Sequence, residues 1–201
     1  MPGGHGQKPL WNCVNRYVRT CRRGTVNTGL TLFLAHANGF PKEIWEIMLR
    51  SLLDSPAAPL VDEVWSFEAV QHGDSALVNA ENLGGIFDTQ DNTRDNANFL
   101  LYYLPDETTP TPLPTQLSRI SQATSDARKE HGFRQRKLVV GHSFGGATSV
   151  LSCPSSPLMP IILSIENKLL QPTVSPWTLG YPCHHSRGDI PFPCDASIDS
   201  P

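Results

Sequence analysis

The sequence predicts an α/β fold with a mainly parallel sheet and helices on both faces. Over the first 150 residues, short apolar runs alternate with longer amphipathic segments, the pattern of strands connected by helices. Several of these apolar runs end in glycine-containing polar turns, as buried strands often do. The 201 residues are 39% apolar and 17% charged, which is the composition of a globular chain long enough for one domain with a core.

The first predicted strand is Leu30–Ala35, because its residues are largely apolar, as expected for a strand buried on both faces. Pro41 is suited to the first position of a helix, and residues 42–53 then place apolar side chains near one helical face. Residues 61–70 are a second predicted strand. His72-Gly73-Asp74-Ser75 follows it and is predicted to be a polar turn.

Two helices are predicted in the middle of the chain. The first spans residues 92–104, with Asp91 as its N-cap. A connection rich in proline and threonine (residues 105–114) leads to the second helix, residues 115–131, which Gly132 ends.

A third strand is predicted at residues 137–140, and a helix begins by residue 147 and is ended by Pro154. Residues 160–166 are the last predicted strand. Nine of the 18 prolines lie from Pro154 onward, so little regular structure is expected after residue 166. We therefore divide the chain into an N-terminal segment with room for early strands (1–28), an α/β core (29–166) and an irregular proline-rich tail (167–201).

Composition excludes several classes of protein. The net charge of −3 and the pI near 6.1 provide no basic field for nucleic acid, and no apolar run approaches the ~20 residues of a membrane span. Residues 1–10 lack the apolar core of a secretion signal. Five scattered cysteines are then expected to be reduced thiols of an intracellular protein.

Gly141-His142-Ser143-Phe144-Gly145 matches the G-x-S-x-G nucleophile elbow of α/β hydrolases. A predicted strand enters the motif and a small-residue helix start leaves it. Ser143 would occupy a strained turn, so Gly141 and Gly145 must lack side chains that collide with the strand or helix. We predict Ser143 as the nucleophile and the N–H of Phe144 as one oxyanion-hole donor. The alternative is a glycine-rich loop with a solvated serine.

A second oxyanion-hole donor is expected from the turn after the Leu30–Ala35 strand. In α/β hydrolases an upstream βα loop supplies this N–H. Asn38, in His36-Ala37-Asn38-Gly39-Phe40, is the residue that we assign to it by position. The alternative is a simple βα turn in which Gly39 provides backbone freedom.

Three stretches in this order give the chain a more specific resemblance: HANGFPKEIW (36–45), HGDSAL (72–77) and GHSFGG (141–146). With them the chain resembles fungal α/β hydrolases related to peroxisomal lipases and to toxin-biosynthesis hydrolases of plant pathogens. The resemblance covers roughly residues 11–166. It implies an α/β-hydrolase fold and esterase-, lipase- or thioesterase-like action on an acyl substrate. It also implies a peroxisomal or cytosolic location and a role in secondary metabolism.

The acid and the base of a catalytic triad are not obvious. Triad partners follow the serine in this fold, which argues against His72 and Asp74, and His142 is expected to pack or line the pocket. Glu166 is a weak acid candidate against the alternative of an ordinary strand-end carboxylate. His184 or His185 are weak base candidates, because no strand precedes them. The spacing of Cys183, His184, His185 and Cys194 matches no established zinc site.

Two functions remain open at this point. One is a serine hydrolase that forms an acyl-enzyme on Ser143, with transfer to an alcohol or amine as a variant of the same chemistry. The other is a non-catalytic α/β-hydrolase-like protein that lacks the last strands, the acid and the histidine, with an unpaired sheet edge at residues 160–166. Neither function implies a metal or organic cofactor. The last three residues, Asp199-Ser200-Pro201, are not a peroxisomal address.

Overall fold

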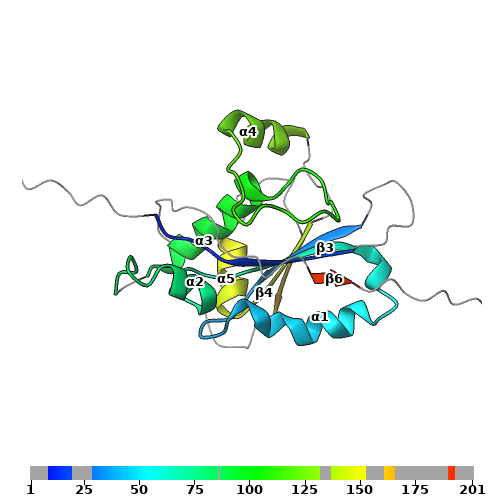
Figure 1. Ribbon diagram of the computed structural model, residues 1–201, viewed down its shortest axis with the longest axis horizontal. Helices are drawn as coiled ribbons and strands as arrows, with labels where there is room; N and C mark the ends of the chain where they lie inside the picture. The colour runs from blue at the N-terminus through cyan, green and yellow to red at the C-terminus, as the bar shows by residue number, and fades with distance from the viewer. Residues whose placement is uncertain are drawn as a thin grey trace, which may run out of the picture.

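The computed structural model describes residues 9–19, 29–85, 87–131, 137–152, 161–165 and 190–192. These residues form one six-stranded sheet of order β5-β4-β2-β3-β1-β6. The β1–β3 pair is antiparallel, and the other four pairs are parallel. Figure 1 shows α1 on one side of the sheet and α3 and α5 on the other. The predicted fold class, an α/β fold with a mainly parallel sheet and helices on both faces, is confirmed.

The strands are β1 (Val14–Arg19), β2 (Leu30–Ala35), β3 (Val61–Phe67), β4 (Lys137–His142), β5 (Ile161–Ile165) and β6 (Ile190–Phe192). The α-helices are α1 (Glu46–Leu53), α2 (Gly73–Val78), α3 (Thr89–Asn98), α4 (Gln122–His131) and α5 (Phe144–Leu151). Two short 3₁₀ helices are η1 (Lys42–Trp45) and η2 (Ala58–Leu60), and a π-helical turn, η3 (Phe99–Tyr103), continues α3.

Alternating side chains of the central strands build two separate cores. Odd-numbered positions such as Phe33 of β2 and Trp65 of β3 pack against Phe99 of η3 on one face. Leu34 and other even-numbered positions face the opposite way, in a cluster with Leu49 of α1. Because successive side chains of a strand point to opposite faces, apolar residues in consecutive positions bury both sides of the sheet.

The helix expected at residues 92–104 begins earlier and ends differently. Asp88, rather than Asp91, is its N-cap, with Asp88 Oδ1 accepting a hydrogen bond from the N–H of Gln90 at 2.9 Å. Asp91 instead pairs with Arg94 one turn later. The last turn widens to π geometry, in which Leu104 N–H donates to the carbonyl of Phe99.

The helix expected at residues 115–131 is formed only as α4. The Ser121 hydroxyl accepts from the N–H of Thr124 at 3.1 Å, so it caps the helix at that point. Ile120 N–H donates to the carbonyl of Tyr102 and is held by that contact outside the helix. Helix propensity alone did not reveal this local competition for the backbone.

Other boundaries also differ from expectation. The strand predicted at 61–70 ends at Phe67, and residues 73–78 form the short helix α2 where a polar turn was expected. The irregular tail predicted from residue 167 contains β6, which pairs with β1 through Tyr17 and Ile190. A three-residue strand with Pro191 at its centre has no apolar alternation to detect, and its place at a sheet edge tolerates the proline.

The topology brings three loops to one edge of the sheet. Strands β2, β3 and β4 are adjacent and parallel, so their carboxyl ends lie together. The segments that leave these ends are residues 36–41, residues 68–72 and Ser143. The candidate site is therefore assembled from segments more than 100 residues apart.

Candidate active site

Ser143 lies in a strained turn between β4 and α5. Its φ of 52° and ψ of −113° make it the non-glycine residue with positive φ among the described ranges. Such backbone geometry costs of the order of 1–3 kcal/mol and persists when the surrounding structure enforces it. Ser143 is exposed, and its carbonyl accepts from Ala147 N–H at 3.0 Å, so α5 starts directly after it.

The two glycines of the elbow are required by close backbone packing. A Cβ on Gly141 would lie 2.5 Å from the carbonyl oxygen of Gly145 and from the backbone of Gly146. A Cβ on Gly145 would collide with the backbone carbonyl of Ala35 at the end of β2. The start of α5 therefore rests on the end of β2, which places the residue after the nucleophile beside the loop that begins at His36.

Asn38 and Phe144, the two predicted oxyanion-hole residues, are linked by His72. His72 Nε2 accepts from the N–H of Gly39, the residue after Asn38, at 2.9 Å, and because it accepts there it lies 3.1 Å from Asn38 Oδ1 without donating to it. The ring of His72 also lies 6.4 Å, centroid to centroid, from the ring of Phe144. The loop after β2, the loop after β3 and the nucleophile turn thus meet at this histidine.

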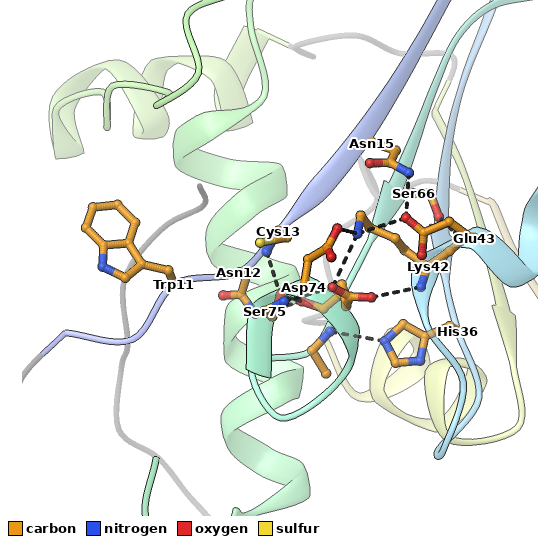
Figure 2. A network of polar contacts seen from close by, with 12 residues as sticks. Trp11, Asn12, Cys13, Asn15, His36, Lys42, Glu43, Ser66, Asp74 and Ser75 are labelled. Carbon is orange, nitrogen blue, oxygen red and sulfur yellow. Dashed lines mark hydrogen bonds and ion pairs between the residues drawn. The ribbon is translucent and has the colours of Figure 1, made fainter. Parts of the chain in front are cut away.

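A buried charge network supports the loop after β2 (Figure 2). At its centre is Lys42, whose side chain is fully buried. Lys42 Nζ lies 2.8 Å from Asp74 Oδ2, 3.0 Å from Glu43 Oε1 and 3.4 Å from Glu68 Oε2. One ammonium group therefore joins η1, the end of β3 and α2.

The pKa values in this network follow from the ion pairs. Burial is the largest single influence on the pKa of Lys42 and lowers it, but the hydrogen bonds to Asp74 and Glu43 together with the charges of Glu68 and Glu43 raise the pKa above its ordinary value. Burial is also the largest influence on Glu43 and raises its pKa, but the contacts with Lys42, together with hydrogen bonds from backbone and Asn15, make the net shift downward. Lys42 is therefore charged at neutral pH, and the three carboxylates around its ammonium compensate this charge.

The carboxylate of Glu68 also organises backbone groups around it. Its two oxygens accept from the N–H groups of Lys42 and Ser75, each at 3.0 Å. Its backbone joins the start of β1, because Glu68 N–H donates to the carbonyl of Cys13 and Asn12 Nδ2 donates to the carbonyl of Glu68. Segments without regular structure obtain here the hydrogen bonds that buried backbone requires.

A second buried polar region holds α5 against α3. Thr148 Oγ1 accepts from Asn92 Nδ2 and Asn96 Nδ2, both at 3.2 Å, and donates to the carbonyl of Gly145 at 3.2 Å. Ser152 Oγ lies 2.8 Å from the carbonyl of Thr93. These contacts anchor the helix that begins at the nucleophile.

Asp95 also lies on α3 and is 7% exposed. Burial raises the pKa of Asp95 to about 7, against a smaller lowering by its hydrogen bond with Asn12. Its carboxyl group is thus partly protonated at neutral pH. This buried acid lies on α3 and precedes Ser143 in the chain, so it does not match the Ser–acid–His order of the fold.

The structure tests the remaining site predictions unevenly. Glu166, His184, His185 and the two cysteines of the zinc alternative lie outside the described residues. His142 ends β4 and pairs in register with Ile165 of β5. Asp74 belongs to the Lys42 network.

The sequence analysis missed Lys42, Glu68 and the polar face of α3. Lys42 and Glu68 look like ordinary surface charges in the sequence, and nothing in their 26-residue separation predicts an ion pair. The pattern TQDNTRDNAN of α3 carries no apolar stripe, although Asn92, Arg94, Asp95 and Asn96 are buried. The sequence carried one signal for the polar face of α3. The helix after the nucleophile, α5, has small and hydroxyl-bearing residues, and a buried hydroxyl needs a polar partner.

Two further observations concern metals and membranes. Within the part of the chain that the structure describes, no group of three or more His, Cys, Asp or Glu side chains has metal-binding geometry. None of the helices in that part has the length and apolar character to cross a bilayer.

Comparison with known proteins identifies one relative by both sequence and structure. No family model matches the chain. Over 76 residues it is 37% identical to the peroxisomal membrane protein LPX1 of Saccharomyces cerevisiae, a region that covers 37% of this chain and 20% of the yeast protein. The solved structure of the yeast peroxisomal α/β-hydrolase Lpx1 aligns with 86% of this chain and 50% of its own length, at 21% identity and a TM-score of 0.44. The chain thus spans about half of the yeast protein's structure, and the region of 37% sequence identity is a fifth of the yeast protein.

Proposed function

We propose that this chain is a serine hydrolase of esterase, lipase or thioesterase type that acts through an acyl-enzyme on Ser143. The observation that carries the proposal is the backbone of Ser143, which is exposed and strained at the junction of a strand and a helix. A structural serine has no need of this geometry, whereas a nucleophile elbow requires it.

In the proposed reaction, Ser143 Oγ attacks the acyl carbon while a base removes its proton. The negative charge that develops on the carbonyl oxygen is held by the N–H groups of Phe144 and Asn38. Collapse of this intermediate breaks the bond to the alcohol or thiol, which leaves with the proton. Water then attacks the acyl-serine ester and releases the carboxylic acid, which restores Ser143.

We assign the base to His184 or His185 and the acid to Glu166, the candidates that follow Ser143 in the order of the fold. No metal or organic cofactor takes part in this scheme. Besides water, the reaction requires only a small acyl substrate as its partner.

The biological setting that we propose rests on the resemblance and on the relative. The relative is named as a peroxisomal protein, which favours a peroxisomal location for this chain as well. The HANGFPKEIW and HGDSAL stretches, which resemble toxin-biosynthesis hydrolases, favour an acyl ester or thioester of secondary metabolism as substrate.

The proposal is tested by labelling the full chain with a fluorophosphonate and measuring its intact mass. We expect one adduct per chain, absent from Ser143→Ala and strongly slowed in the variant that lacks the base, His184→Ala or His185→Ala. Ser149→Ala, a buried serine of α5, is the matched control and should label normally. A folded wild-type chain that forms no adduct would overturn the catalytic proposal in favour of a non-catalytic acyl-binding or partner-binding protein.

A further inference from the structure

Two histidines connect the loops after β2 and β3 in a reciprocal way. His36, in the loop after β2, accepts from the N–H of Ala69 in the loop after β3 through Nε2 at 3.1 Å. In the opposite direction, His72 of the second loop accepts from the N–H of Gly39 in the first loop at 2.9 Å. The two imidazole rings meet edge to face with centroids 4.9 Å apart. Each loop thus receives a histidine from the other.

Both bonds require neutral imidazoles, because a protonated ring nitrogen donates and cannot accept an N–H. His36 Nδ1 lies 2.8 Å from the carbonyl of Ala37, which places its single proton on Nδ1 and leaves Nε2 as acceptor. Burial lowers the pKa of His36 to about 4 and also lowers the pKa of His72. The two rings therefore satisfy this requirement at neutral pH.

The charged groups around the two imidazole rings do not change the conclusion that both rings are neutral at neutral pH. Lys42 and Glu43 act on His36 in opposite directions, and Glu68 opposes the effect of burial on His72. A charge on His72 further disfavours protonation of His36. Acidification is expected to protonate His72 before His36, because His36 is more deeply buried.

We infer that His72 is a positioning residue of the oxyanion hole, holding the loop of Asn38 through Gly39 while His36 returns the same type of contact. The inference rests on the proposed function, since Asn38 is significant only if its N–H receives an oxyanion. Gly39 has φ of 80°, so the turn at Asn38–Gly39 contains a residue in the left-handed region. A fixed acceptor for the Gly39 N–H sets the orientation of the peptide group between Asn38 and Gly39. His72 supplies this acceptor at the Phe144 side of the site.

A pair of variants separates the polar contact from ring packing. In His72→Gln the amide oxygen can accept from Gly39 N–H, and the amide nitrogen can donate to Asn38 Oδ1. In His72→Phe the ring remains, but no acceptor is present. His131→Phe on α4 removes a histidine elsewhere and serves as control.

The first measurement does not depend on activity. The Gly39 amide, followed by hydrogen exchange at neutral pH, should lose protection by about tenfold or more in His72→Phe and keep it in His72→Gln. In the wild-type chain its NMR signal should move as the His72 ring is protonated on acidification. Equal protection of Gly39 in wild type and His72→Phe, or a Gly39 signal that ignores His72 titration, would overturn the positioning role.

The second measurement is the rate of Ser143 phosphonylation. Loss of one oxyanion donor slows acyl transfer by about 10²–10³, so partial misplacement of Asn38 in His72→Phe should slow labelling by roughly 10–100-fold. Labelling of His72→Gln should stay within about threefold of wild type. If the wild-type chain is not labelled but its Gly39 amide is protected, the serine-hydrolase proposal is refuted, and the contact between His72 and Gly39 still stands. Normal labelling of His72→Phe refutes the positioning role and retains the hydrolase.

Discussion

Two buried polar regions support the candidate site, and they are built on opposite principles. The network beneath the loop after β2 is ionic, with Lys42 surrounded by Glu43, Glu68 and Asp74. The contact between α3 and α5 uses amide and hydroxyl groups instead, centred on Thr148. The first region ties together η1, the end of β3 and the first turn of α2, where backbone N–H groups lack partners within their own element, whereas the second joins two helices along their sides.

The difference shows how charge is used where backbone needs partners. A carboxylate accepts several N–H groups at once, as Glu68 does with Lys42 and Ser75, and so it can organise a loop. Packed helices need only local complementarity, which neutral side chains supply without the cost of desolvating an ion. The two regions should therefore respond differently to substitution and in opposite directions to pH.

The largest effect is expected from Lys42→Met. This substitution leaves Glu68 fully buried without its cation, and loss of one partner of a buried ion pair costs about 3–5 kcal/mol. Urea unfolding at pH 7 should show this loss. Arg50→Met on α1, which removes an exposed cation, should change the free energy of unfolding by less than about 0.5 kcal/mol. A small effect at Lys42 would mean that the network does not stabilise the fold.

Asp95→Asn tests the buried acid of α3, the helix that also carries the amides of the neutral region, through its pH dependence. Because the pKa of Asp95 rises from 3.8 to about 7 on folding, the folded state binds the proton more tightly. The resulting stability is present below pH 3.8 and is lost as the pH rises through about 7. Asp95→Asn should remove this decline and be more stable than wild type at pH 8, by up to about 4 kcal/mol.

Urea midpoints at pH 5 and pH 8 measure the effect of Asp95→Asn. Glu81→Gln, on an exposed loop, is the control and should follow the wild-type curve. If Asp95→Asn and wild type lose stability in parallel between these pH values, Asp95 is ionised in the folded protein and the prediction is wrong.

Thr148→Val should destabilise the protein by about 1–3 kcal/mol, because the Asn92 and Asn96 amides lose their shared acceptor in a buried place. The shape of the side chain is nearly unchanged, so packing is preserved. Thermal unfolding measures the loss, and Thr93→Val on the exposed side of α3 is the matched control. Equal melting temperatures for the two variants would contradict the anchoring role of Thr148.

The smallest effect is expected for Glu43→Gln, since the Glu43 side chain is 26% exposed and solvent screens its pair with Lys42. The pKa of Glu43 is lowered on folding, so its contribution is present above pH 4.5 and is lost as the pH falls through the folded pKa. The variant should lose up to about 1 kcal/mol at pH 7, and this loss should shrink as the pH falls through the folded pKa of Glu43. This direction is opposite to that of Asp95, and a loss that does not change as the pH falls would refute it.

The sequence predicted those parts of the molecule that depend on local pattern. Leu30–Ala35 was recognised because both sheet faces are buried, and Ser143 because Gly141 and Gly145 report close backbone approach. The Lys42 network and the burial of α3 were missed, because their partners are distant in the chain and polar residues carry no periodic signal. His72 was predicted only as part of a polar turn and not as a triad member, and its contact with Gly39 depends on two loops that follow different strands.

The pairing of Tyr17 with Ile190 has a consequence for the synthesis of the chain. The two residues are separated by 173 positions, the difference of 190 and 17. At roughly 5–20 residues per second, the outer edge of β1 waits about 10–30 s for its partner strand on the ribosome. During this interval β1 presents unpaired N–H and C=O groups, a template for pairing with another nascent chain. Translation speed and chaperone access should therefore affect the yield of folded protein more than they affect the stability of the finished fold.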